Sequence, residues 1–155
     1  MFSNVNFLGN IDVKADNKGR LFVPAQYRKQ LERENESSLV MRINRVLRCA
    51  EFFPMSVWEE MDKEFKSKLN MWDAKDKMLY RQFISQVEVM EMDASGRILL
   101  KKEHCETIGI TTDARFVGVS DHFEVWNGDS LDQSLYSPEE FEKLMQEKMG
   151  NTTVQ

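Results

Sequence analysis

Hydrophobic and polar positions follow the same order in two stretches of this 155-residue chain. In each, strand-like runs flank an Asp-x-x-Gly-Arg turn, and a short helical pattern and two further strand-like runs follow. The stretches DNKGRLFVPAQYR, from Asp16, and DASGRILLKKEHC, from Asp93, mark the two copies at a lag of 77 residues. The pattern predicts an internal duplication of a β-rich unit of about 45 residues.

The two halves continue with matching segments. SLVMRI at 38–43 corresponds to RFVGVS at 115–120, and EFFP at 51–54 corresponds to EVWN at 124–127. A unit this small rarely buries enough apolar surface to fold alone. We therefore expect the two copies to pack together, or to interleave, around one core in an α+β chain.

Helical patterns separate the two copies. Ser56 and Glu59, shortly after Pro54, form a capping-box signature for the start of a helix. Its apolar positions recur at helical spacing, at Trp58, Met61, Phe65, Leu69 and Trp72. A second helix is expected over residues 74–86, followed by an alternating strand, VEVMEM, that leads into the second turn.

The chain is predicted to end in a further helix, because Ser137 is a favourable N-cap and Pro138 suits the first helical position. We expect the residues after Gly150 to fray. The expected organisation is a first repeat at 7–54, a helical linker at 55–86, a second repeat at 87–130, and a C-terminal helix and tail at 131–155.

Charge is distributed unevenly along the sequence. The whole chain has a net charge of −5, yet residues 14–48 contain nine basic and four acidic side chains, a net charge of +5. The remaining residues therefore have a net charge of −10. This asymmetry is typical of a polyanion-binding face on an otherwise acidic particle, although a mixed, well-solvated surface would give the same count.

The composition argues against membrane and enzymatic roles. No apolar run approaches the roughly 20 residues of a membrane span, and the N-terminus lacks a signal-peptide pattern. Cys49 and Cys105 are expected to be reduced thiols of a cytoplasmic protein. His104 and Cys105 are adjacent and point in different directions, which makes a poor nucleophile–base pair. Without a nucleotide-binding glycine motif or zinc-ligand spacing, we expect no enzyme activity, cofactor, metal or small-molecule substrate.

The repeated Asp-x-x-Gly-Arg turn contains the candidate chemistry. Glycine tolerates a positive φ angle and allows a tight turn, while the Asp can accept backbone N–H groups and pair with the Arg. A guanidinium held at the start of a strand can bind a phosphate or a guanine edge through two hydrogen bonds. In the alternative interpretation, Asp and Arg only stabilise the turn. Two copies in register, the first in the basic segment, favour a shared binding role.

The chain resembles the MraZ family, whose members are bacterial DNA-binding regulators of the division and cell-wall gene cluster. The resemblance covers essentially the whole chain and rests on DNKGRLFVPAQYRKQL, FFPMSVWEEM, DASGRILL and VGVSDHFEVWN, in this order. It implies a duplicated swapped-hairpin, SpoVT/AbrB-like β-barrel core with flanking helices. It also implies a ring-like homo-oligomer whose turns face DNA.

The motif residues and the basic residues around the first copy are the expected DNA-binding positions. These are Asp16, Lys18, Arg20, Arg28, Lys14, Lys29, Asp93 and Arg97. Lys18, inside the first turn, is expected to reach phosphate, and Arg28 matches a basic position of the family.

The second copy departs from this pattern. It has Ser95 where the first copy has Lys18, and Cys105 where the first copy has Arg28. We therefore expect the first copy to supply more of the DNA-binding energy.

The resemblance implies a sequence-specific transcriptional regulator, a repressor of its own division and cell-wall operon, that binds short repeats in double-stranded promoter DNA. We expect it in the cytoplasm, associated with the nucleoid and with no membrane partner. The alternative is an antitoxin-like protein-binding module of the same fold. The polar remainder at 151–155 offers no long acidic tail to cover a toxin.

Overall fold

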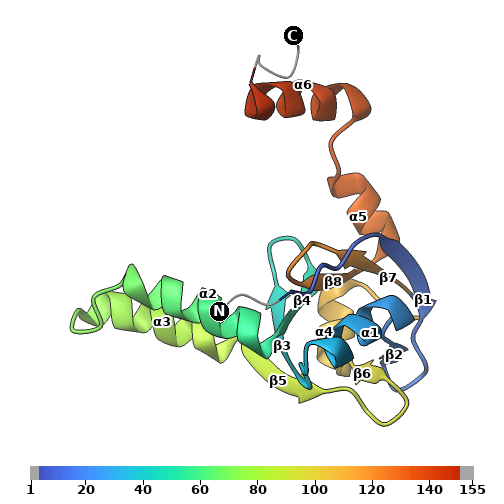
Figure 1. The fold of residues 1–155 in the computed structure, drawn as a ribbon, viewed down its shortest axis with the longest axis horizontal. Coiled ribbons are helices and arrows are strands. Elements are labelled where there is room, and N and C mark those ends of the chain that lie inside the picture. The colour runs from blue at the N-terminus through green and yellow to red at the C-terminus, as the bar shows by residue number, and fades with distance from the viewer. Residues whose placement is uncertain (1–3, 151–155) are drawn as a thin grey trace.

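The computed structural model describes residues 4–150, which form an α+β fold built on an antiparallel sheet (Figure 1). The sheet has six strands in the order β1-β7-β8-β4-β3-β5. Their bounds are Asn10–Lys14 (β1), Ser38–Asn44 (β3), Cys49–Pro54 (β4), Val87–Glu91 (β5), Asp113–Gly118 (β7) and Phe123–Trp126 (β8). Two further strands, β2 (Arg20–Phe22) and β6 (Arg97–Leu99), pair with each other in a separate two-stranded ribbon.

Strands of the two sequence repeats are intermixed within the sheet. β1 of the first repeat pairs with β7 of the second, with Ile11 opposite Phe116. Reciprocally, β5 of the second repeat pairs with β3 of the first, with Val89 opposite Val40. β4 pairs with its counterpart β8, just as β2 pairs with β6. The two copies therefore exchange strands, and neither completes its sheet alone.

The expected closed β-barrel is not found in residues 4–150. β1 and β5 are the edges of an open sheet, because each forms a ladder with only one neighbouring strand. Tight turns at 16–20 and 93–97 redirect the chain after these edge strands. The three-residue strands that follow pair with each other instead of extending the main sheet.

Aromatic side chains fill the core under the sheet. The largest fully buried rings are Phe7, Tyr27, Phe52, Phe116 and Phe123. Phe52 stacks on Phe123, with ring centroids 5.3 Å apart. The equivalent helices α1 (Ala25–Arg33) and α4 (Lys102–Ile108) each contribute buried residues to this core. The inner face of the ribbon contributes Leu21, so the two repeats share one core.

Helices α2 (Met55–Ser67) and α3 (Ala74–Ser85) form a hairpin that projects from the sheet (Figure 1). Phe83 joins them: its ring stacks with Trp58 at 5.3 Å and meets Phe65 at 4.5 Å. The prediction that Trp72 continues this apolar stripe is wrong. Trp72 lies in the connection between the two helices and is 98% exposed.

The start of α2 differs from the sequence prediction. The helix begins with Pro54 as its N-cap residue and without a side-chain cap, so Ser56 and Glu59 form no capping box. Instead, the Glu36 carboxylate accepts hydrogen bonds from the Ser56 backbone N–H, at 3.3 Å, and from the Ser56 hydroxyl. Glu36, from the loop between α1 and β3, thus supplies the capping acceptor.

Helices α5 (Gly128–Ser134) and α6 (Pro138–Met149) end the described chain. Ser137 caps α6 as predicted, because its hydroxyl accepts a backbone N–H of the first turn at 3.2 Å. α6 stands apart from the sheet and its core (Figure 1). The tail that we expected to fray, 151–155, lies outside the described residues. No helix within 4–150 is long and apolar enough to cross a membrane.

Candidate nucleic-acid interface

Residues 16–20, the first turn, are held together by the carboxylate of Asp16. Its Oδ1 accepts the backbone N–H groups of Lys18 and Arg20, both at 2.9 Å. Its Oδ2 accepts the Nε–H of Arg20 at 2.6 Å. One carboxylate therefore fixes both the backbone of the turn and the direction of the arginine. The terminal guanidinium nitrogens of Arg20 have no hydrogen bond to another described residue.

Residues 93–97, the second turn, repeat this arrangement. Asp93 Oδ1 accepts the backbone N–H groups of Ser95 and Arg97 at 2.9 Å, and Oδ2 accepts the Arg97 Nε–H at 2.8 Å. The Arg97 guanidinium also lies over the Phe22 ring, 5.6 Å from its centroid. Both turns thus present an arginine that is oriented by its own Asp.

These contacts keep both carboxylates ionised. Hydrogen bonds from the Arg20 backbone and side chain, and from the Lys18 backbone, lower the pKa of Asp16 to about 2. The corresponding hydrogen bonds from Arg97 and Ser95 lower the pKa of Asp93. Because a lowered pKa favours the charged form, each arginine keeps its anionic partner throughout the neutral range.

Each turn depends on its glycine and lies close to the opposite repeat. Gly19 and Gly96 have φ angles of +85° and +86°. A Cβ atom at Gly19 would lie 2.1 Å from the Leu100 carbonyl oxygen, and one at Gly96 would lie 2.7 Å from Arg28 Cδ. The backbone N–H of Leu100 donates to the Gly19 carbonyl at 2.8 Å. A side chain at Gly19 would collide with the Leu100 backbone, and one at Gly96 would displace the Arg28 side chain.

The ribbon of β2 and β6 places both arginines on one outer face. Successive strand residues alternate between faces, so the middle residue of each strand is buried. The register puts Arg20 opposite Leu99 and Arg97 opposite Phe22. Phe22 and Leu99 are 53% and 45% exposed. Neither apolar residue was among the expected binding positions. The alternation of strand residues between faces after each arginine could have identified them.

Helix α1 carries Arg28 to the second turn rather than to the first. Its Nη1 donates to the Val23 carbonyl at 2.7 Å, and its Cδ packs against Gly96. The position of Arg28 could therefore not be inferred from its proximity to Arg20 in the sequence. The expectation that the first copy supplies more DNA-binding energy loses part of its basis.

The three candidate lysines have different surroundings. Lys18 is exposed within the first turn, and Lys29 is exposed on α1. Lys14, at the end of β1, lies 2.5 Å from Asp113 Oδ1. That hydrogen bond and the charge of Asp113 raise the pKa of Lys14. Of the three, Lys18 is the one that the first turn itself presents near Arg20.

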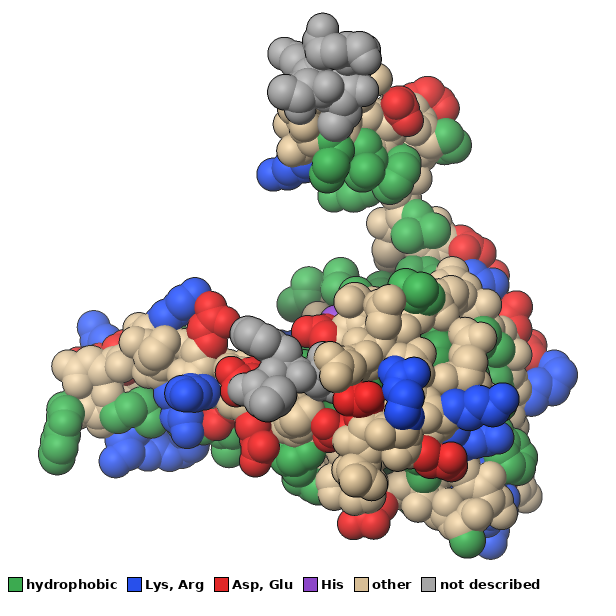
Figure 2. Space-filling model, viewed as in Figure 1, with side chains coloured by type: hydrophobic (Ala, Val, Ile, Leu, Met, Phe, Trp, Pro, Cys, Tyr) green, Lys and Arg blue, Asp and Glu red, His purple; other side chains and the backbone are tan. Residues whose placement is uncertain are grey.

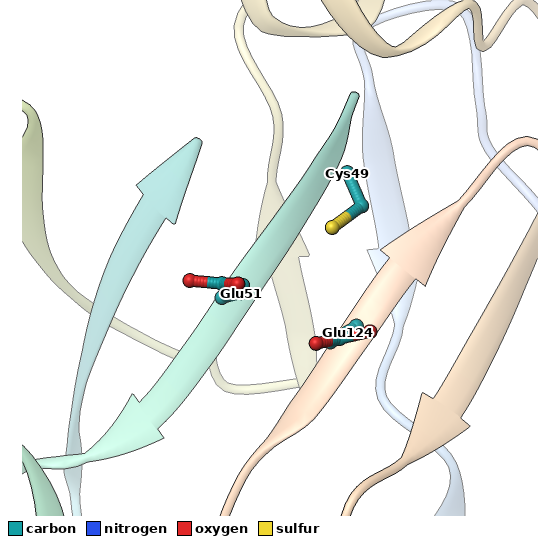
Figure 3. A group of neighbouring side chains, drawn as sticks. All are labelled: Cys49, Glu51 and Glu124. Carbon is teal, nitrogen blue, oxygen red and sulfur yellow. The ribbon is translucent and has the colours of Figure 1, made fainter. Parts of the chain in front are cut away.

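Cys49, Glu51 and Glu124 form a second cluster, on β4 and β8 (Figure 3). Their potential ligand atoms lie within 4.8 Å of one another. The Glu51 carboxylate already accepts hydrogen bonds from Arg42, at 2.8 Å, and from Asn44, at 3.3 Å. Burial, with the two nearby carboxylates, raises the pKa of the Cys49 thiol. A metal ion needs a thiolate and free oxygens, so this cluster does not fit one.

A protein-family model matches the chain twice, over residues 7–82 and 83–155. The family is described as "MraZ protein, putative antitoxin-like". The two matches begin near the starts of the two sequence repeats.

Curated relatives cover nearly the whole chain. A protein named Transcriptional regulator MraZ from Bacteroides thetaiotaomicron is 42% identical over 147 residues, 95% of this chain and 94% of the relative. The protein of the same name from Bacteroides fragilis is 40% identical over 152 residues, 96% of each chain. That from Flavobacterium psychrophilum is 30% identical over 145 residues, 93% of this chain and 92% of the relative.

Proposed function

Because this chain belongs to the MraZ family, we propose that it is a sequence-specific DNA-binding transcriptional regulator whose turns contact double-stranded promoter DNA. The names of its curated relatives support the regulatory role. The observation that carries the DNA-binding role is the ribbon, which presents Arg20 and Arg97 on one outer face. The two Asp residues hold these arginines in a defined direction.

A two-stranded ribbon fits the major groove of DNA. Arg20 and Arg97 occupy diagonal positions, about 7–8 Å apart in such a ladder, which is close to two base-pair steps. A guanidinium that binds a guanine edge through two hydrogen bonds contributes about 1–3 kcal/mol of discrimination. Phe22 and Leu99, which flank the arginines, suit contact with thymine methyl groups.

The regulator acts, in this proposal, as a ring-like homo-oligomer on short promoter repeats and represses its own division and cell-wall operon. One subunit offers few base contacts, whereas linked subunits gain effective concentration on repeated sites. Exposed apolar side chains at and after the end of α5 support self-association, and Figure 2 shows hydrophobic side chains on one side of α6. They are Leu135, Tyr136, Phe141, Met145 and Met149, between 40% and 65% exposed.

The same proposal includes the organisation of the chain and its location. Reciprocal pairing of β1 with β7 and of β5 with β3 supports two swapped-hairpin units, at 7–54 and 87–130, joined by a helical linker at 55–86. The helix and tail at 131–155 follow the second unit. A non-enzymatic regulator of this kind works in the cytoplasm, on the nucleoid.

A second candidate function is an antitoxin-like module that binds another protein. The wording of the family description and the exposed apolar side of α6 favour it. It predicts no preference for the gene's own promoter, whereas the regulator requires one, so a titration with promoter DNA separates the two.

The test is a titration of DNA carrying the gene's upstream repeats, and of a scrambled duplex, with the Arg20→Ala and Arg97→Ala variants. Each variant is expected to lose about 1–3 kcal/mol of preference for the repeats. Arg81→Ala, on the projecting hairpin, is the control and should bind like the parent. Normal binding by both turn variants would contradict the proposal and leave the turns a purely structural role.

A further inference from the structure

Arg28 lies at the junction between the ribbon and the second turn. Its Nη1 donates to the Val23 carbonyl at 2.7 Å, while the backbone N–H of Val23 donates to the Gly96 carbonyl at 3.0 Å. Its Cδ fills the space in which a Gly96 side chain would begin. The first repeat therefore places a guanidinium directly beside the turn of the second repeat.

Cys105 occupies the equivalent place beside the first turn. Its thiol donates to the Leu100 carbonyl at 3.6 Å, and the backbone N–H of Leu100 donates to the Gly19 carbonyl at 2.8 Å. Its Sγ would lie 3.7 Å from a Cβ atom built on Gly19. Helices α1 and α4 thus each place a side chain beside the turn of the other repeat, with the same backbone contacts. The side chain is Arg28 in one case and Cys105 in the other.

This exchange balances the charge of the two turns. The first turn contains Lys18 but has the neutral Cys105 against it. The second turn contains Ser95 in place of the lysine but has Arg28 against it. Each turn therefore has one basic side chain besides its motif arginine. In the first turn it is Lys18, and in the second turn it is Arg28 from the other repeat.

The charge of Arg28 is not neutralised by a close carboxylate. Glu32 follows it by four residues, a spacing that favours an ion pair on a helix. Among residues 4–150, however, no carboxylate lies within 4.0 Å of the Arg28 guanidinium. Glu32, Glu36, Glu91 and Asp93 line the same hollow of about 550 Å³ beside the second turn. The Glu36 carboxylate already accepts a hydrogen bond from Ser56, and the Asp93 carboxylate accepts one from Arg97. The guanidinium retains free donors for an external anion.

We propose that Arg28 completes a composite DNA site at the second turn, where it binds a backbone phosphate next to the base edge contacted by Arg97. This inference rests on the DNA-binding function proposed above and adds that both turns of one subunit engage DNA. The phosphate contact fixes the position of the ribbon, and Arg97 reads the sequence. Arg28 is a positioning residue contributed by the first repeat to the site of the second.

The first test compares Arg28→Gln and Arg28→Lys on the promoter repeats at several salt concentrations. Gln keeps a donor for the Val23 carbonyl but removes the charge, whereas Lys keeps the charge. A roughly fourfold rise in salt lowers the affinity of the parent for DNA. Without one phosphate interaction, this loss of affinity should be about threefold smaller. We expect this flattening with Arg28→Gln and a smaller change with Arg28→Lys. A parental salt response in Arg28→Gln, with a parental melting temperature, would overturn the inference.

The reciprocal test adds the missing charge to the first turn. Cys105→Arg can reach the Leu100 carbonyl as Arg28 reaches that of Val23, so it should bind the repeats more tightly and with a steeper salt response. Cys105→Ser is the neutral control and should match the parent. Cys105→Arg is also expected to restore the salt response of Arg28→Gln. Failure to do so while the double variant remains folded would count against equivalent sites.

Coupling to the motif arginines separates this inference from the proposed function. In double-variant cycles, Arg28→Gln should be coupled to Arg97→Ala and additive with Arg20→Ala. If Arg97→Ala weakens DNA binding but shows no coupling to Arg28→Gln, only the composite site is wrong. If the parent binds no promoter DNA, the regulator proposal fails as well.

Discussion

Each motif arginine is held in one direction by the Asp of its own turn. In the first turn, Asp16 accepts the Nε–H of Arg20 and leaves the terminal nitrogens available. In the second turn, Asp93 does the same for Arg97, and the Phe22 ring supports the guanidinium from one side. A side chain that is already ordered loses less rotamer entropy on binding. Such preorganisation strengthens base reading more than it strengthens nonspecific attraction.

Substitution of Asp16 by Asn tests this orientation. The amide oxygen can still accept backbone N–H groups, but the NH₂ group cannot accept the Nε–H of Arg20. We expect preference for promoter repeats over scrambled DNA to fall roughly tenfold in Asp16→Asn. Affinity for scrambled DNA should hold or rise, because one negative charge is removed. Anisotropy titrations measure both quantities.

Asp73→Asn is the matched control for that experiment. It removes the same charge at the N-cap of α3, where Asn is an equally good capping residue, far from the ribbon (Figure 1). Its preference for the repeats should equal that of the parent. An unchanged preference in Asp16→Asn as well would mean that the Asp–Arg contact does not orient a base-reading group.

Local contacts in the turns could be predicted from the sequence, and contacts between the repeats could not. Asp16 and Arg20 are four residues apart around a glycine, so their pairing follows from short-range geometry. The place of Arg28 depends on strand exchange, which brings Gly96 of the other repeat beside it. One repeat read by itself contains no signal for that contact.

At the scale of elements, the start of α2 links the first repeat to the projecting hairpin. The first backbone N–H groups of a helix need external acceptors. Pro54, the N-cap residue, has no side-chain acceptor to offer. The Glu36 carboxylate, from the loop between α1 and β3, accepts from Ser56 instead. This contact also places an anion at the positive end of the helix dipole.

Removal of that carboxylate should destabilise the protein. We expect Glu36→Ala to lower the free energy of unfolding by about 1 kcal/mol, the usual effect of removing an N-terminal cap. Urea denaturation monitored by circular dichroism gives the value. Glu32→Ala removes an exposed carboxylate four residues earlier and should change stability far less. Equal effects of the two substitutions would show that Glu36 is not a cap.

Periodicity predicted the helices better than their boundaries or the sheet. The expected helix at 74–86 is α3, Ala74–Ser85, and the predicted cap of α6 at Ser137 is present. The apolar spacing that included Trp72 continued beyond the true end of α2, because an exposed turn residue can fall on the period by chance. Closure of the sheet depends on pairing between distant strands, which no local pattern determines.

At the scale of the whole molecule, the ribbon and the apolar side of α6 are separate surfaces (Figure 1). The ribbon and α6 lie on opposite sides of the sheet and its core (Figure 1). Subunits that associate through α6 would leave both turns free for DNA. The chain has a net charge of −5, so a single subunit is repelled by DNA away from its basic segment. Several ribbons on neighbouring repeats would offset that repulsion through effective concentration.

Association through α6 should be visible in the size of the particle in solution. The parent chain of 18.2 kDa should sediment as a larger species at micromolar concentration, because α6 stands apart from the core (Figure 1) and Phe141 on it is 55% exposed. Phe141→Glu should weaken association at least tenfold if this ring is an anchor of the interface. Lys143→Gln changes the net charge by the same amount on the same helix and should assemble normally.

Binding to DNA with several repeats should fall with Phe141→Glu, whereas binding to one repeat should not, since the ribbon is untouched. A parent that sediments only as an 18.2 kDa monomer would rule out both the ring and the avidity argument.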